Sequence, residues 1–264
     1  PCWTLKASNS VISMSQSPLL PGYHMANQLP YDGAMMPAEL QRNISEVEAR
    51  IRAAERLAGR PSGSVSLLAV SKTKPAGLVR QAHRAGLTAF GENYAQEMSE
   101  KAQALADLPL SWHFIGPIQS NKTALIAETC DWVHSIDRLK VARRLSEQRP
   151  PDKGPLNVLI QINTSAEVSK SGGTVEAVED LAAAVSELPG LSLRGLMTIP
   201  APAQGRDAQR RPFNQCRILM EQLSATLPQL DTLSMGMSGD MEAAVEEGAH
   251  IVRIGTDIFG ARYN

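Results

Sequence analysis

The chain has 264 residues, 43% of them apolar and 20% charged, which suits one large α/β domain or two small ones. A net charge of −1 and a pI of about 6.6 provide no field that would attract nucleic acid or an anionic membrane. No apolar run approaches the roughly 20 residues that cross a bilayer, and no secretory leader pattern stands at the start.

The three cysteines, Cys2, Cys130 and Cys216, lie far apart in the sequence. They form neither a disulfide framework nor a CxxC metal pair, so we predict no metal site. Buried or idle thiols are typical of a reducing compartment, and we therefore expect a cytoplasmic protein.

Residues 1–36 are rich in Ser, Pro, Asn and Met and lack periodicity, which predicts a disordered or non-native extension. Next comes an amphipathic helix that stops before Gly59 and Pro61, with apolar positions at Leu40, Ile44, Val47, Ile51, Ala54 and Ala58. Eight short apolar runs then alternate with helical patterns. The predicted strands are Ser66–Val70, Thr88–Phe90, Trp112–Ile115, Trp132–Ile136, Asn157–Ile162, Leu193–Ile199, Thr232–Met235 and Ile251–Ile254.

The alternation of strands and helices predicts a parallel sheet in an α/β fold. Eight such units match the length of a single (β/α)8 TIM barrel, which would occupy residues 37–264 behind the extra N-terminal helix. An open doubly wound sheet is the alternative, although no GxGxxG follows the first strand. The polar stretch Ala201–Pro212 is expected to be a long loop.

Lys72 stands two residues past the first apolar run, where the active face of such a barrel would lie. Desolvation there would lower its pKa, and a neutral amine can attack an aldehyde to form a Schiff base. A solvated loop lysine is an equal alternative on position alone. Lys74 is the competitor, but Pro75 should start a helix and turn Lys74 outward.

Other strand ends carry weaker signals. Asn93 could hydrogen-bond a ligand oxygen, although capping the next helix is the simpler role. His113 lies within a strand and is expected to be a core or supporting group. Lys170, among glycines and serines after the fifth strand, suggests an anion-friendly loop or an ordinary flexible one.

The strongest cluster comes from the last two strands. Ser238 follows the seventh strand, and Gly255 and Thr256 follow the eighth, where these barrels usually hold phosphate. Arg253 should share a face with Ile251 and point into the site, where a buried cation needs a partner. An amine opposite a phosphate site suits an aldehyde that carries phosphate, and pyridoxal 5′-phosphate (PLP) is the common one.

The sequence resembles the pyridoxal phosphate homeostasis proteins from about Leu40 to Tyr263. The similar segments occur in order: Leu67–Pro75, Phe90–Tyr94, Trp112–Gly116, Gln119–Lys122, Ser169–Gly172, Arg194–Met197, Gly236–Ser238 with Asp240–Met241, and Val252–Thr256 with Ile258–Gly260. The resemblance implies a fold type III barrel like the cofactor domain of alanine racemase. It also implies a Schiff base of PLP on Lys72 and a role in vitamin B6 balance.

By the same resemblance, Asn93 would line the cofactor, and Arg253 would face the pyridine nitrogen. Ser238, Gly255 and Thr256 would hold the phosphate. A cation at Arg253 disfavours ring protonation, which weakens the ring as an electron sink. Racemisation needs a second base, which the racemases take from an additional β-domain, and a chain ending at Asn264 leads us to expect no such domain.

Three hypotheses follow from the sequence. The first is a monomeric PLP-binding homeostasis protein without robust turnover, with PLP-dependent apoenzymes as candidate partners for cofactor exchange. The second is a weak PLP-dependent amino-acid racemase. The third is a Schiff-base aldolase that acts on a sugar phosphate.

Overall fold

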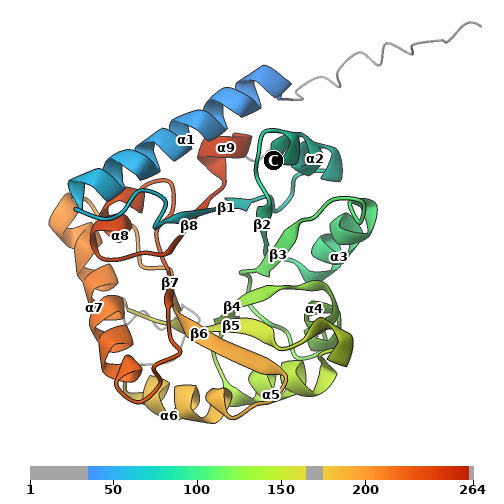
Figure 1. Cartoon of the computed structure of the whole chain (residues 1–264), viewed down its shortest axis with the longest axis vertical. Helices are drawn as coiled ribbons and strands as arrows, with labels where there is room; N and C mark the ends of the chain where they lie inside the picture. Colours follow the sequence, from blue (N-terminus) through green and yellow to red (C-terminus); the bar gives the residue numbers. More distant parts are fainter. Residues whose placement is uncertain (1–34, 165–174, 262–264) are drawn as a thin grey trace, which may run out of the picture. The chain divides into compact units, whose positions relative to one another are not determined.

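The computed structural model describes residues 35–164 and 175–261. Within them, eight parallel strands close into a barrel in chain order, and β8 pairs with β1. Figure 1 looks along this ring of strands, with the helices packed outside it. Of the predicted extension, residues 1–36, only Met35 and Met36 fall within the described part.

The strands are β1 (Ser66–Val70), β2 (Ala89–Glu92), β3 (Ser111–Phe114), β4 (Trp132–Ile136), β5 (Leu156–Ile162), β6 (Leu191–Thr198), β7 (Thr232–Ser234) and β8 (Ile251–Ile254). The helices are α1 (Pro37–Leu57), α2 (Ala76–Arg84), α3 (Ala95–Ala104), α4 (Thr123–Thr129), α5 (Leu139–Gln148), α6 (Val175–Ser186), α7 (Arg206–Ser224), α8 (Met241–Glu246) and α9 (Thr256–Phe259), with a 3-10 turn η1 (Pro151–Lys153) before β5. The predicted (β/α)8 barrel is confirmed and the open-sheet alternative is wrong, because the sheet closes on itself.

Strand alternation divides the apolar residues into two layers. In β1, Leu68 and Val70 pack with Ile251 of β8 in a small cluster, which strand parity places inside the ring. Ala69 instead joins the large cluster between the strands and the helices. Alternate side chains of β1 and β8 therefore point into the barrel, and Arg253 has the parity of Ile251.

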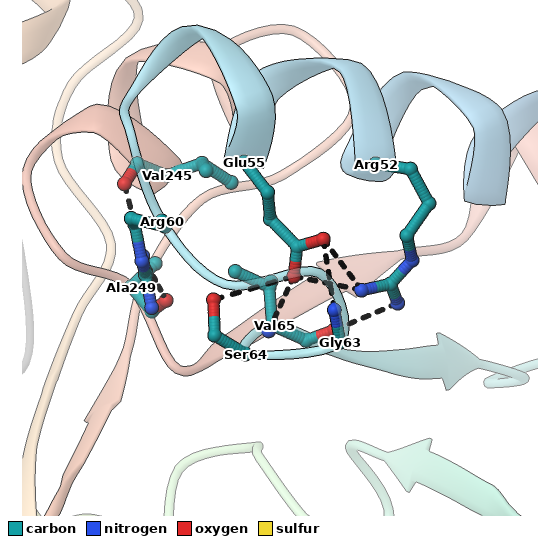
Figure 2. Close-up of polar contacts among 8 residues, drawn as sticks. All are labelled: Arg52, Glu55, Arg60, Gly63, Ser64, Val65, Val245 and Ala249. Atoms are coloured by element: carbon teal, nitrogen blue, oxygen red, sulfur yellow. Dashed lines mark hydrogen bonds and ion pairs between the residues drawn. The ribbon is translucent and has the colours of Figure 1, made fainter.

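Helix α1 precedes the first strand and lies across the side of the ring that carries α8 and α9 (Figure 1). Its apolar stripe, from Leu40 to Ala54, is buried as the spacing predicts. Glu55, near the end of the helix, is fully buried and accepts hydrogen bonds from the backbone N–H groups of Gly63 (3.1 Å) and Val65 (2.7 Å) and from Arg52 (2.6 Å). Figure 2 shows how this carboxylate fastens α1 to the loop that leads into β1.

The prediction of a loop from Ala201 to Pro212 is wrong in its second half, because α7 begins at Arg206 after Gly205, whose φ is +85°. The residues of the first helical turns are exposed or half-buried, and the first fully buried one is Phe213. The apolar periodicity that reveals a helix therefore starts only past Pro212.

No helix in the described part of the chain is both long and apolar enough to cross a membrane.

Candidate functional site

The six predicted site residues lie on one arc of the barrel rim, which consists of the ends of β7, β8, β1 and β2 in that order. Ser238 follows β7, Arg253 lies in β8, Gly255 and Thr256 follow β8, Lys72 follows β1, and Asn93 follows β2. Backbone bonds join neighbouring strands near the rim, from Arg253 N–H to Gly236 O (2.9 Å) and from Ser71 N–H to Gly91 O (3.0 Å). Because β1 also pairs with β8, with Ala69 opposite Ile254, the strand ends that carry the predicted amine and the predicted phosphate ligands are adjacent.

The turn that carries Lys72 is held from both sides. On one side, the buried Ser71 hydroxyl donates to Glu92 Oε1 at 2.7 Å. On the other, Thr73 N–H donates to Glu97 Oε1 at 2.6 Å, and Thr73 has a φ of +64°. A β-branched residue in the left-handed region costs on the order of 1–3 kcal/mol, so its contacts must fix the turn firmly. Lys72 itself is half-buried.

Lys101 of α3 connects these contacts beneath the turn. Its buried ammonium group donates to Ser71 O (2.7 Å), to Glu92 Oε1 (2.7 Å) and to Glu97 Oε1 (2.6 Å). Burial raises the pKa of Glu92, while the charge of Lys101 opposes that rise. The buried Glu92 and Lys101 and the half-buried Glu97 together form a polar support for the backbone on either side of Lys72.

Lys74 does not turn outward as predicted. Its side chain is 8% exposed, and its Nζ donates to Ala261 O at 3.0 Å. Pro75 does start α2 as the N-cap residue, but the lysine before it extends along the last described segment of the chain. Burial lowers the pKa of Lys74, which keeps this lysine a chemical competitor of Lys72.

The segment after β7 is a tight turn that glycine makes possible. Gly236 has a φ of +96°, and a Cβ there would lie 2.6 Å from the Cβ of Ala244. Asp240 closes the turn by accepting a hydrogen bond from Met237 N–H at 2.6 Å. Burial raises the pKa of Asp240, although this backbone bond opposes the rise. After β8, a Cβ on Gly255 would lie 3.2 Å from Val70 O, so the β8 end packs closely on the end of β1.

Arg253 is buried at 3% exposure. It donates to Ser234 Oγ at 2.8 Å and to Thr198 O at 2.9 Å, and it forms no ion pair with a carboxylate of the described residues. Burial lowers its pKa to about 10, so the side chain is still a cation at neutral pH. A buried cation without a carboxylate is costly unless an anion or another acceptor approaches it.

Two buried histidines continue the contacts of Arg253 across the barrel. Ser234 Oγ lies 2.9 Å from His134 Nδ1, His134 Nε2 lies 2.9 Å from His113 Nδ1, and His113 Nε2 lies 3.1 Å from Ser111 Oγ. Because Ser234 accepts from Arg253, its own proton is best donated to His134 Nδ1. This order assigns the proton of each imidazole to Nε2.

The two imidazoles are neutral. Burial lowers the pKa of His113 to about 3 and holds the pKa of His134 well below its ordinary value. His113 also stacks on Trp132 with ring centroids 5.7 Å apart. The prediction of a supporting rather than a ligand role for His113 agrees with this position.

The residues on the arc fit a phosphorylated aldehyde. Asn93 Oδ1 is buried and has no hydrogen-bond partner among the described residues. The N-cap of α3 is Tyr94, without a side-chain cap, so the capping role considered for Asn93 is wrong. The rim thus offers three kinds of group to a ligand. Asn93 offers an unpaired amide oxygen, Arg253 offers a positive charge, and the glycines of the turns offer backbone N–H groups that no side chain of their own covers. The loop with Lys170 lies outside the described residues.

Comparisons with known proteins define the class. The chain matches the family model for the alanine racemase N-terminal domain over residues 43–263. It is 60% identical over 223 residues to the pyridoxal phosphate homeostasis protein of Pseudomonas aeruginosa, covering 84% of this chain and 96% of that one. For the pyridoxal phosphate homeostasis protein of Escherichia coli K12 the identity is 51% over 227 residues, covering 85% and 97%. The chain therefore belongs to the alanine racemase N-terminal domain family and, within it, to the pyridoxal phosphate homeostasis proteins.

Solved structures agree with this assignment. PipY of Synechococcus elongatus, solved with PLP bound, is 33% identical with a TM-score of 0.72, covering 84% of this chain and 100% of that one. Alanine racemase of Corynebacterium glutamicum is 16% identical with a TM-score of 0.62, covering 83% of this chain and 61% of the racemase. The second likeness shows the shared barrel fold alone.

Sequence reasoning missed the residues that support the arc. Glu92 belongs to a segment that resembles the family, but nothing in the local pattern pairs it with Lys101. His134 and Ser234 are 100 residues apart in the chain and gave no periodic signal. A polar residue inside an otherwise apolar strand is the one available clue, and it applies to His134, Ser234 and Arg253 alike.

Proposed function

We propose that this protein binds PLP as a Schiff base on Lys72 and serves intracellular PLP homeostasis without robust catalytic turnover. The observation that carries the proposal is the single arc of the rim, which joins the supported Lys72 turn to the glycine turns after β7 and β8. The relatives named for PLP homeostasis and the PLP-bound structure of PipY support the choice of cofactor.

In this proposal each residue of the arc has a separate task. Lys72 supplies the amine, and the contacts of Ser71 and Thr73 keep its backbone in place. Ser238, Gly255 and Thr256 hold the phosphate, Asn93 lines the ring, and Arg253 faces the pyridine nitrogen. When bound, PLP supplies an electrophilic aldehyde and a ring that can accept electron density.

The position of Arg253 favours binding over fast chemistry. A cation beside the pyridine nitrogen disfavours protonation there, because like charges repel. Ser234 and Thr198 fix the guanidinium, and neither supplies the negative charge that would offset it. An unprotonated ring is a weak electron sink, so broad transaminase turnover is expected to be slow.

We also propose the domain bounds, the oligomeric state, the location and the partners of this protein. We assign residues 37–264 to the PLP-binding barrel and residues 1–36 to an extension outside it. The protein would act as a monomer in the cytoplasm and give PLP to PLP-dependent apoenzymes. Burial raises the pKa of the thiols of Cys130 and Cys216, which makes both inert and suits a reducing compartment.

A weak racemase is the second candidate, because the barrel fold is that of alanine racemase.

One experiment separates these functions. The purified protein is mixed with a PLP-free aminotransferase, and the recovered transaminase activity is followed. In parallel, the protein is kept with L-alanine in heavy water, and loss of the α-proton is followed by NMR. We expect cofactor transfer and no steady exchange. Steady exchange at a catalytic rate would favour the racemase, and a protein that binds no PLP would contradict the proposal.

A further inference from the structure

Helix α1 lies outside the (β/α)8 repeat, yet one of its arginines reaches the proposed phosphate segments. The guanidinium of Arg50 donates to Glu242 Oε1 at 2.9 Å, to Asp257 Oδ2 at 2.7 Å and to Ser238 O at 3.1 Å. Ser238 belongs to the turn after β7, and Asp257 directly follows Thr256 after β8. One side chain thus joins the two segments to which the phosphate ligands are assigned.

The geometry of these contacts suits a spacer, that is, a side chain that holds two chain segments at a fixed distance from each other. A guanidinium is planar and rigid, and it presents its N–H groups in fixed directions, so three acceptors bound to it keep a fixed spacing. Because the C=O and N–H of a trans peptide point in opposite directions, binding of Ser238 O by Arg50 directs the N–H of Gly239 away from α1. Asn43, two turns earlier on α1, donates to Ile258 O at 3.1 Å and fixes α9 as well.

Three carboxylates lie close to the same segments, and a positive charge is needed beside them if the segments are to bind a phosphate. Asp240, Glu242 and Asp257 all lie on or beside the two segments, and carboxylates repel a phosphate. Asp240 is bound by the N–H of Met237, and the positive charge of Arg253 acts on it. Glu242 and Asp257 both pair with Arg50. Burial lowers the pKa of Arg50, but the bonds and charges of Glu242 and Asp257 outweigh burial and raise it, so the arginine stays charged.

We propose that Arg50 is a positioning residue of the phosphate site, which sets the spacing of segments 236–240 and 255–257 and offsets two carboxylates beside them. Arg50 itself would not touch the phosphate. The inference rests on the proposed function, because it assumes that these segments hold the phosphate of PLP. It makes the helix before the barrel a part of the cofactor site.

The test compares two ligands that differ only in the phosphate. Dissociation constants for PLP and for pyridoxal are measured by absorbance titration of the full chain and of its Arg50→Ala variant. We expect Arg50→Ala to weaken PLP binding by about tenfold or more, since several charge-assisted bonds are lost, and pyridoxal binding by less than about twofold. Equal weakening of both ligands, or of neither, would overturn the inference.

Two further variants make the result specific. Arg42 lies on the same helix but is exposed, and among the described residues it pairs only with exposed Glu46, at 3.9 Å, so Arg42→Ala should leave both constants unchanged. If Arg50→Ala does not fold, Arg50→Lys keeps the charge but lacks the planar, rigid set of N–H groups that holds three acceptors at a fixed spacing, and PLP binding alone should still weaken. Wild-type affinity for PLP in Arg50→Lys would contradict the spacer role. If the wild-type protein binds no PLP, the proposed function fails instead.

Discussion

The neutral histidine pair inside the barrel predicts a specific loss of stability in weak acid. The pKa of His113 falls from about 6.5 in the unfolded chain to about 3 in the folded one, because the ring is buried. On acidification the unfolded chain therefore binds a proton that the folded protein excludes. Stability due to neutral His113 is complete above the unfolded pKa and is lost as the pH falls from about 6.5 towards about 3.

The size of this loss follows from the shift in pKa. Each pKa unit corresponds to about 1.4 kcal/mol, so His113 alone should cost about 2 kcal/mol between pH 7 and pH 5. The full difference of about 3.5 units would cost about 5 kcal/mol once the pH lies well below about 3, which rivals the whole stability of many domains. His134 should add to the slope in the same direction, since its pKa is also held low by burial.

The assay compares wild type with His113→Asn, both freed of PLP, in urea unfolding series at pH 7, 6 and 5. Asparagine retains a group that can bond to His134 but does not titrate. The variant loses the stacking on Trp132 and should be less stable than wild type at pH 7. As the pH is lowered, however, its free energy of unfolding should fall less steeply than that of wild type. The difference in stability between the two proteins should therefore be about 2 kcal/mol smaller at pH 5 than at pH 7. Parallel stability curves would refute a neutral, buried His113.

Two further predictions concern the polar supports of the fold. Glu55→Gln removes the negative charge that accepts hydrogen bonds from the N–H groups of Gly63 and Val65. We expect it to destabilise the protein by about 2–3 kcal/mol, measured by urea unfolding at pH 7. A loss below about 0.5 kcal/mol would show that this carboxylate does not hold α1. Lys101→Met leaves Glu92 buried without its cation and should cost about 3–5 kcal/mol, most of which the double variant Glu92→Gln/Lys101→Met should restore. If the double variant is as unstable as Lys101→Met, the buried charge is not the cause.

The strands were predictable because each one is a short apolar run between polar turns. β1, β4 and β8 begin and end at the predicted residues, and the other strands shift by at most two. The start of α7 was missed because Arg206 and Asp207 face solvent, where no apolar period marks a helix. Local pattern therefore predicts an element only where the element buries a face.

The strand ends of the candidate site were predictable for a different reason. In a parallel barrel, residues that follow consecutive strands must meet on one rim, so strand order alone brings Lys72 close to the β8 end. The supports were not predictable, because the contacts of Arg50 with Ser238 and of His134 with Ser234 join residues 188 and 100 positions apart. Lys74 was misplaced because the position of Pro75 fixes the start of α2 but not the direction of the preceding side chain.

The most direct test of the account is borohydride reduction of the PLP-loaded protein, followed by peptide mapping. Reduction fixes the pyridoxyl group on the lysine that holds it, and the Lys72, Lys74 and Lys170 modifications are told apart by fragmentation. We predict a pyridoxyl group on Lys72. A label found only on Lys74 or Lys170, or on no lysine, would contradict the assignment of the amine to the turn after β1.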